Sequence, residues 1–122
     1  MFGRTLLWVV LTFALVAVSV ALLIGPNYVR DDLVEAARQG DTQRINLLLA
    51  LGANPSRVGF EEHVTPLGAA AQSGRSDVVR LLLRKSANVN EKDDHQETAL
   101  GIARRHGKTE IVRLLEAAGG HP

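Results

Sequence analysis

The sequence between Thr65 and Glu116 repeats one pattern at a fixed interval. Both copies begin with Thr, reach a Gly nine residues later, and continue with a run of branched apolar residues. Thr98 follows Thr65 at an offset of 33 (98 − 65), and Gly107 follows Gly74 at the same offset (107 − 74). Such a period is typical of stacked helical hairpins, because a single hairpin cannot bury its apolar face alone. We therefore predict an all-α solenoid.

A third, less complete copy precedes these two. Asp31 and Asp32 place negative charge where a first helix would begin, and Gly40 closes that helix at an offset of 34 from Gly74 (74 − 40). Asp41 can then cap a second helix. The pattern predicts three helical hairpins in one domain over residues 31–120, with repeats at about 31–63, 64–96 and 97–120.

One position indicates where the array stops. Leu49, Leu83 and Glu116 are equivalent in the three copies, at offsets of 34 (83 − 49) and 33 (116 − 83). In a stack the inner copies pack against the following repeat, whereas the last copy faces solvent. The change from Leu to Glu therefore predicts that the third repeat is the end of the stack.

These residues resemble the ankyrin-repeat family. Its signature opens with Thr-Pro-Leu-His and two Ala, continues with a Gly and an apolar run, and closes with Gly-Ala-Asp/Asn. The matching residues are Thr65-Pro66-Leu67, Ala70-Ala71, Gly74, Val78-Val79, Leu81-Leu82, Gly52-Ala53-Asn54 and Ala87-Asn88-Val89-Asn90. The resemblance covers about residues 31–120 and implies a module that binds other proteins.

The sequence departs from the family pattern at two kinds of position. Gly68 and Gly101 replace the signature His, so the usual Thr–His hydrogen bond is expected to be absent. His63 and Gln96 lie where the family favours a residue with positive φ, and Ser86 replaces the closing Gly. These departures predict a modestly stable array with the same fold.

The chain begins with an uncharged apolar segment over residues 5–24. Twenty residues of helix span about 30 Å, which is the thickness of the hydrocarbon layer of a bilayer. Gly25 and Pro26 are then predicted to end the helix, and residues 25–30 to form a linker. We expect residues 1–24 to be a single transmembrane signal-anchor helix that precedes the repeats.

A cleaved signal peptide is the alternative for the same segment. Ala17-Val18-Ser19 and Ser19-Val20-Ala21 resemble small-residue cleavage sites, but the apolar run is longer than signal peptides usually carry. The positive charge of Arg4 favours a cytoplasmic location for the residues that precede the apolar segment. The prediction is a single-pass membrane protein whose repeats lie on the extracytoplasmic, periplasmic side.

Composition and motifs exclude several classes of function. The absence of cysteine rules out disulfides, thiolate catalysis and cysteine-based zinc sites. Lys and Arg number 14 against 13 Asp and Glu, and this balance argues against a nucleic-acid-binding protein. No phosphate-binding glycine loop, paired His or nucleophile–base arrangement occurs. We therefore predict no catalytic residues, cofactor, metal or small-molecule substrate.

The resemblance implies that a partner docks on the concave side, at the hairpin tips and the ends of the first helices. Carried over by position, the candidate protein-binding residues are Arg38, Gln39, Phe60, Glu61, Glu62, Val64, Gln72, Ser73, Asp93, Asp94, His95, Glu97, Arg105 and His106. The identity of the partner does not follow from the scaffold.

Two features of the predicted tips leave alternatives open. Phe60 is either an exposed aromatic anchor, of the kind that dominates binding energy, or a residue that packs beneath its own loop. Glu61-Glu62-His63 and Asp93-Asp94-His95 recur at an offset of 32 (93 − 61). They form either an acidic ridge for a basic partner or ordinary solvated loop tips.

The first hypothesis for function is a membrane-tethered protein that binds another protein as an adaptor or assembly factor. The alternative is a secreted or periplasmic binding protein released by cleavage. In a third hypothesis the spanning helix is the binding element, and the repeats stabilise a membrane complex.

Overall fold

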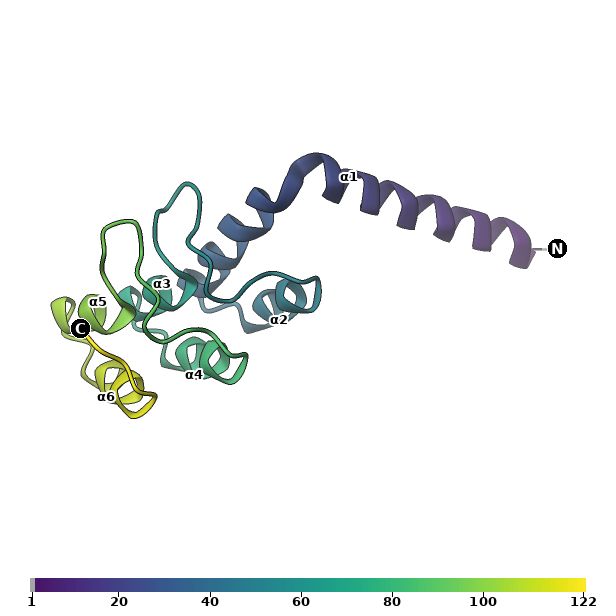
Figure 1. Ribbon diagram of the computed structural model, residues 1–122. Coiled ribbons are helices and arrows are strands. Elements are labelled where there is room, and N and C mark those ends of the chain that lie inside the picture. Colours follow the sequence, from purple (N-terminus) through teal and green to yellow (C-terminus); the bar gives the residue numbers. More distant parts are fainter. Residues whose placement is uncertain (1) are drawn as a thin grey trace.

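The computed structural model describes the backbone of residues 2–122 and the side chains of residues 3–19 and 31–122. In this part the chain forms the helices α1 (Phe2–Gln39), α2 (Thr42–Ala50), α3 (Pro66–Gln72), α4 (Ser76–Arg84), α5 (Ala99–Arg105) and α6 (Thr109–Ala117). Three hairpins lie side by side, the first made by the C-terminal part of α1 with α2 (Figure 1). The predicted all-α class and the three repeats are confirmed.

Helix α1 is longer than the sequence predicted. Its bounds include Gly25 and Pro26, where we predicted a helix end, and the whole predicted linker 25–30. Proline removes one backbone donor, and a helix can continue beyond it with a local change of direction. The predicted separate helix beginning at Asp31 is therefore the last part of α1. The side chains of residues 20–30 lie outside the described residues.

The N-terminal part of α1 extends away from the repeats (Figure 1). The side chains of residues 3–19 are all exposed. Within the described residues, no helix combines the length and the apolar character needed to cross a membrane. The predicted span over residues 5–24 includes residues 20–24, whose side chains lie outside that described part.

Side-chain caps mark the beginning of α2, α3 and α5, whereas α4 and α6 begin without one. Thr65 Oγ1 accepts a hydrogen bond from the Gly68 N–H at 2.9 Å, and Thr98 Oγ1 accepts one from the Gly101 N–H at 3.2 Å. Asp41 caps α2 through its side chain. Each cap satisfies a backbone donor that the helix itself leaves free.

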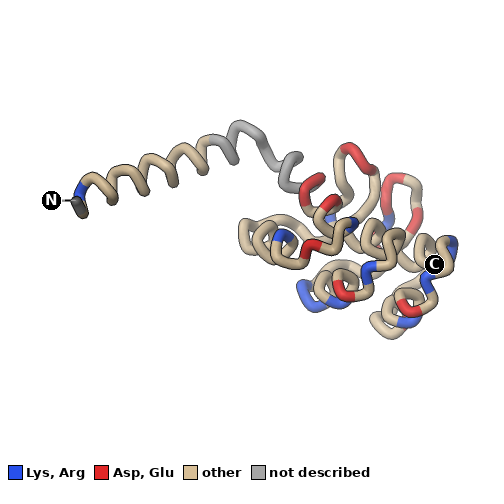
Figure 2. The backbone as a smooth tube through the Cα atoms, turned by 180° about the vertical axis from the view of Figure 1, so that it is seen from behind, with Lys and Arg blue, Asp and Glu red and all other residues tan. Residues whose placement is uncertain are grey.

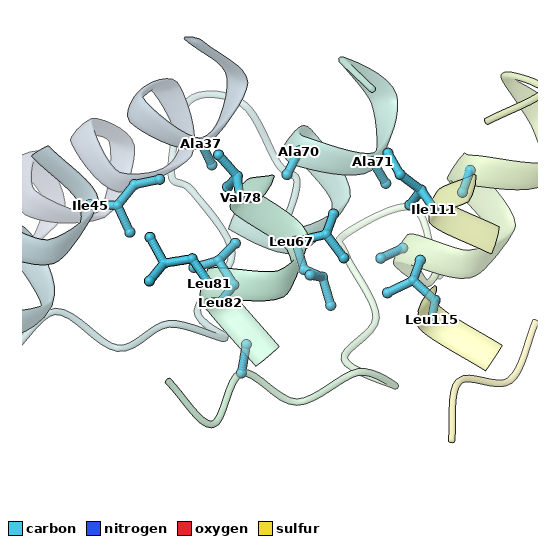
Figure 3. Packing of buried hydrophobic residues seen from close by; sticks show 14 of the residues in the cluster. Ala37, Ile45, Leu67, Ala70, Ala71, Val78, Leu81, Leu82, Ile111 and Leu115 are labelled. Carbon is cyan, nitrogen blue, oxygen red and sulfur yellow. The ribbon is translucent and has the colours of Figure 1, made fainter. Parts of the chain in front are cut away.

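The buried residues form one cluster that continues through all three repeats (Figure 3). The first helices contribute buried alanines, among them Ala37, Ala70 and Ala103, which allow neighbouring helices to approach closely. The second helices contribute larger side chains, such as Ile45 and Leu82. No single hairpin holds this core, so each repeat depends on its neighbour for burial.

The equivalent position at the end of the second helices behaves as predicted. Leu49 and Leu83 are half-buried and pack against the core, whereas Glu116 is exposed. The Glu116 carboxylate accepts a hydrogen bond from Arg104 at 2.7 Å. The C-terminal face of the stack is therefore polar at this position.

Candidate functional site

Two long loops project on the same side of the stack. The first finger loop, residues 51–65, connects α2 to α3, and the second finger loop, residues 85–98, connects α4 to α5. Both rise next to the first helices, and in Figure 1 they stand side by side. The candidate binding residues come from these loops and from the adjoining helix ends.

The first finger loop is held by α1. Asp31 Oδ1 accepts hydrogen bonds from the Phe60 N–H at 2.6 Å and from the Glu61 N–H at 3.2 Å. A Cβ atom at Gly59 would lie 3.0 Å from Val34 Cγ2 and 3.2 Å from Asp31 Oδ1, so a side chain at this position would crowd α1. These contacts fix the backbone that carries Phe60.

The second finger loop is held from within. Asp93 Oδ1 accepts hydrogen bonds from the His95 N–H at 2.8 Å and the Glu97 N–H at 2.9 Å. The Asp93 side chain is only 3% exposed, and its Oδ2 is buried without a hydrogen-bond partner among the described residues. Asp93 therefore cannot contact a partner as predicted, because its short carboxylate is used to close its own turn.

The two fingers contact each other directly. His63 Nδ1 lies 2.7 Å from Asp94 Oδ2, and the Asp94 N–H donates to the His63 carbonyl at 3.2 Å. His63 and Gln96 both have a left-handed backbone conformation and occupy equivalent positions in successive repeats. Counting back two residues from each, Asp94 is equivalent to Glu61. The offset of 32 between the acidic triplets therefore differs by one residue from the offset of 33 between equivalent positions, although the two tips do contact each other.

Two ion pairs tie the fingers to helix ends. Arg38, near the end of α1, pairs with Glu62, and Arg105, at the end of α5, pairs with Glu97 at 2.7 Å. The hydrogen bond to Glu62 raises the pKa of Arg38 above its ordinary value, although partial burial opposes this effect. These four predicted residues are therefore brought together in two surface ion pairs.

Phe60 is an exposed aromatic side chain at the finger tip. Its side chain is 60% exposed, so it does not pack beneath its own loop. It lies at the edge of a shallow hollow of about 540 Å³, lined by Val58, Gly59, Phe60, Glu61, His63 and Asp94. The structure thus shows the exposed alternative for this side chain, and its role as an anchor stays a prediction. We call Phe60, Glu61, His63, Asp94 and His95 the finger surface.

The candidates other than Phe60 differ in exposure. Glu61, Asp94 and His95 within the finger surface are exposed, and the neighbouring Val64 is half-buried. Among the helix-end candidates, the exposed residues are Gln39, Gln72, Arg105 and His106, and Ser73 is half-buried. Apart from Asp93, each predicted residue has surface that a partner can reach.

Acidic residues gather on the finger side of the repeats (Figure 2). A second hollow, of about 360 Å³, is lined by five carboxylates: Asp31, Asp32, Glu35, Glu61 and Glu62. Arg44 pairs with Asp32, and Arg38 with Glu62, so carboxylates outnumber arginines here. Sequence reasoning placed Glu61 and Glu62 at this surface but missed Asp31, Asp32 and Glu35, which belong to a helix far away in sequence.

Among the side chains that the structure describes, no group of three or more His, Asp or Glu residues is arranged to hold a metal ion. The fingers present an exposed aromatic ring, flanking carboxylates and a backbone held by hydrogen bonds. Such an arrangement suits non-covalent contact with another molecule.

Comparison with known sequences agrees with the repeat pattern. A profile of ankyrin repeats in three copies matches residues 33–121. Rabankyrin-5 of Mus musculus is 38% identical over 74 residues, which are 60% of this chain and 6% of that protein. The probable E3 ubiquitin-protein ligase XBOS33 of Oryza sativa subsp. japonica is 43% identical over 77 residues, which are 62% of this chain and 15% of that protein.

Glycerophosphocholine phosphodiesterase gde1 of Schizosaccharomyces pombe is 39% identical over 64 residues, which are 52% of this chain and 6% of that protein. The chain thus spans only a small part of each of these relatives. Their names describe much longer proteins, and the activities in those names belong to them.

Proposed function

The chain belongs to the ankyrin-repeat family, and on that premise we propose that it is a membrane-tethered protein that binds a partner protein through its finger surface. It serves as an adaptor or assembly factor and carries out no catalysis of its own. Repeat stacks of this kind use an extended concave side for binding, and the two fingers project together on one side of this stack (Figure 1).

The observation that carries the proposal is the rigid presentation of Phe60. The ring is exposed, yet the Phe60 amide is hydrogen-bonded to Asp31, and Gly59 packs against α1. An exposed aromatic side chain on a fixed backbone loses little conformational entropy when it binds. Residues of this kind dominate the binding energy of protein interfaces.

The charge around Phe60 favours a basic partner. Glu61 and Asp94 line the same hollow as the ring, and three further carboxylates from α1 lie beside Glu61. A negative surface speeds the association of a positively charged partner and disfavours an acidic one. We therefore propose that the partner presents lysine or arginine side chains to the fingers.

The tether is supported by the apolar side chains of α1. Leu6, Trp8, Phe13 and Leu15 are among the large apolar side chains exposed on the N-terminal part of this helix. Helices on the surface of soluble proteins keep polar residues on one face, and apolar surface of this extent is rare on them. We propose that residues 5–24 span a bilayer once, with the repeats on the extracytoplasmic side.

The binding proposal is tested by affinity capture with the tagged full chain from detergent-solubilised membranes. We expect Phe60→Ala to reduce the amount of captured partner by a factor of about ten or more relative to the wild type, which is the loss typical of a hot-spot residue. Arg84→Ala, an exposed change on α4, is the matched control and should leave capture unchanged. Equal capture by all three proteins would remove the finger surface from the proposal.

The tether is tested separately by flotation of the full chain with liposomes after alkaline extraction. A spanning helix keeps the protein in the lipid fraction. Release of the intact chain into the aqueous fraction would contradict membrane insertion, and loss of about 20 N-terminal residues from the mass would favour a cleaved signal peptide.

A further inference from the structure

One face of α2 is uncovered, although the equivalent faces of α4 and α6 are covered. Leu47, Leu81 and Leu114 occupy the same position in the three second helices. Leu47 is 60% exposed, Leu81 is 7% exposed, and Leu114 is half-buried against the core. Only the first repeat leaves this position open to solvent.

This comparison shows the direction in which the position faces. If the shared position of these three leucines faced the following repeat, α4 would cover Leu47, and Leu114 in the last repeat would be exposed to solvent. The opposite is observed, so the leucine at this position faces the preceding repeat. Figure 3 agrees, since the Leu81 side chain is directed toward Ile45 of the first repeat. Leu47 therefore lies on the open N-terminal end of the stack.

A second leucine extends the same uncovered face. Leu51, the C-terminal cap residue of α2, is 70% exposed, and it follows Leu47 by four residues, so the two side chains are neighbours. The equivalent cap residues in the other repeats are Lys85 and Ala118. We call Leu47 and Leu51 the open end of the stack.

The other end of the stack is finished differently. Glu116 forms its ion pair with Arg104, and the C-terminal tail folds back over the third repeat. Thr98 Oγ1 donates to the His121 carbonyl at 2.9 Å, and the His121 N–H donates to Asn90 Oδ1 at 2.7 Å. Terminal repeats need a polar outer face to remain soluble. The C-terminal end of the stack has such a polar face, whereas the open end carries two exposed leucines instead.

The position of α1 indicates what covers the open end. The apolar part of α1 leaves the repeats on the side of α2, and both views show it extending away from α5 and α6 (Figures 1 and 2). Leu33 in the core follows residue 24 by only nine positions in the sequence, and nine residues span at most about 30 Å even when fully extended. The first repeat cannot move far from whatever surface holds the apolar segment.

We infer that the open end, Leu47 and Leu51, rests on the lipid surface in which the N-terminal segment is anchored. The inference depends on the proposed tether and adds an orientation to it. The first repeat lies at the membrane, the stack points away from it, and the fingers remain accessible from the aqueous side. The leucines enter the boundary between headgroups and acyl chains, as apolar side chains of peripheral helices do.

The absence of cysteine in the chain allows a direct test with the full protein. Leu51→Cys, Lys85→Cys and Ala118→Cys place the same fluorescent label at the same cap position of each repeat. Each labelled protein is incorporated into phosphatidylcholine vesicles with and without a lipid that carries a quencher near the headgroup. We expect the label at residue 51 to be quenched about threefold more than the labels at 85 and 118, because interfacial contact reaches only about 5–10 Å into the bilayer.

A second variant tests the leucine itself. Leu47→Gln in the Leu51→Cys background should reduce the quenching at residue 51, while circular dichroism and thermal unfolding remain unchanged because Leu47 is largely exposed. Equal quenching at the three cap positions overturns the inference. So does concentration-dependent energy transfer between copies labelled at residue 51, which would show that a second copy covers the open end.

Failure of the inference is distinguishable from failure of the tether. If the labelled protein floats with the vesicles but the three labels are quenched equally, the tether stands and the orientation is wrong. If the protein does not float, the proposed membrane tether itself is wrong, and the inference falls with it.

Discussion

Three residues with side chains hold a left-handed backbone conformation at loop ends. His63, Ser86 and Gln96 have φ values of 57°, 65° and 62°. This conformation costs an L-residue roughly 1–2 kcal/mol, and glycine adopts it without that cost. The departures from the family pattern predicted this strain, because glycine is the residue favoured at such positions. The array therefore carries local strain that a single substitution can relieve.

Ser86→Gly should stabilise the repeats. Ser86 is exposed, so the change removes the left-handed strain without disturbing the core. Glycine also increases the entropy of the unfolded chain by about 0.4–1 kcal/mol, which leaves a net gain of roughly 0.5–1 kcal/mol. The free energy of unfolding in urea measures it. Ser86→Ala is the control and should show no gain, whereas equal gains for both variants would contradict the explanation.

Two helix-interior glycines should respond differently to alanine. At Gly101 the nearest atom to an added Cβ is Thr98 Oγ1 at 3.7 Å, so Gly101→Ala should gain roughly 1 kcal/mol of stability. At Gly68 the added Cβ would lie 3.0 Å from Ile102 Cδ1, and crowding of this kind costs about 1–3 kcal/mol. Gly68→Ala should therefore be neutral or destabilising. Denaturant unfolding of the two variants would contradict this if their order were reversed.

The finger loops differ in what holds them. The first depends on the Asp31 carboxylate from α1, whereas the second is closed by its own Asp93. A hydrogen bond to a charged acceptor is worth about 1.5–3 kcal/mol, so the loss of Asp31 should loosen the first finger while the second stays ordered.

Asp31→Ala should therefore increase the hydrogen-exchange rates of the Phe60 and Glu61 amides, which lose their acceptor. The His95 and Glu97 amides are the internal control, because they donate to Asp93 and should keep their rates. Exchange that stays slow at Phe60 and Glu61 would show that Asp31 does not order the loop.

The hairpins could be predicted from the sequence because their signals act over a few residues. Thr65 caps the helix that begins at the next residue, and Gly74 supplies the left-handed turn that ends the same hairpin helix. The link between Asp31 and Phe60 could not be predicted, because it joins residues far apart in sequence and depends on how the loop lies on α1. The burial of Asp93 was missed because an acidic residue at a loop tip is usually solvated.

The two ends of the molecule are chemically distinct. The third repeat ends in charged and polar contacts, among them the ion pair of Glu116 with Arg104. The sequence predicted the charged residue at this position but not its partner. The first repeat leaves Leu47 and Leu51 exposed, and the apolar part of α1 departs from this side. The sequence did not reveal this asymmetry, because Leu47 and the buried Leu81 are the same residue type, and only their neighbours differ.

Negative charge is concentrated in one part of the molecule. Carboxylates gather on the fingers and on the adjoining part of α1 (Figure 2), whereas α4 and α6 carry both signs, with Arg84 and Arg113 near Asp77, Glu110 and Glu116. The near-zero balance of the total charge conceals this local excess of carboxylates. A partner that approaches the fingers therefore meets a negative surface on a nearly neutral molecule.

Site-specific photo-crosslinking tests most directly whether the finger surface is where a partner binds. A photoreactive amino acid is placed at residue 60 or at residue 84 of the full chain, expressed in its native cells. We expect residue 60 to form an adduct with one discrete protein whose contacting segment is basic, and residue 84 to form none. Adducts of equal yield from both positions, or a partner crosslinked only from residue 84, would contradict the assignment of the fingers as the binding surface.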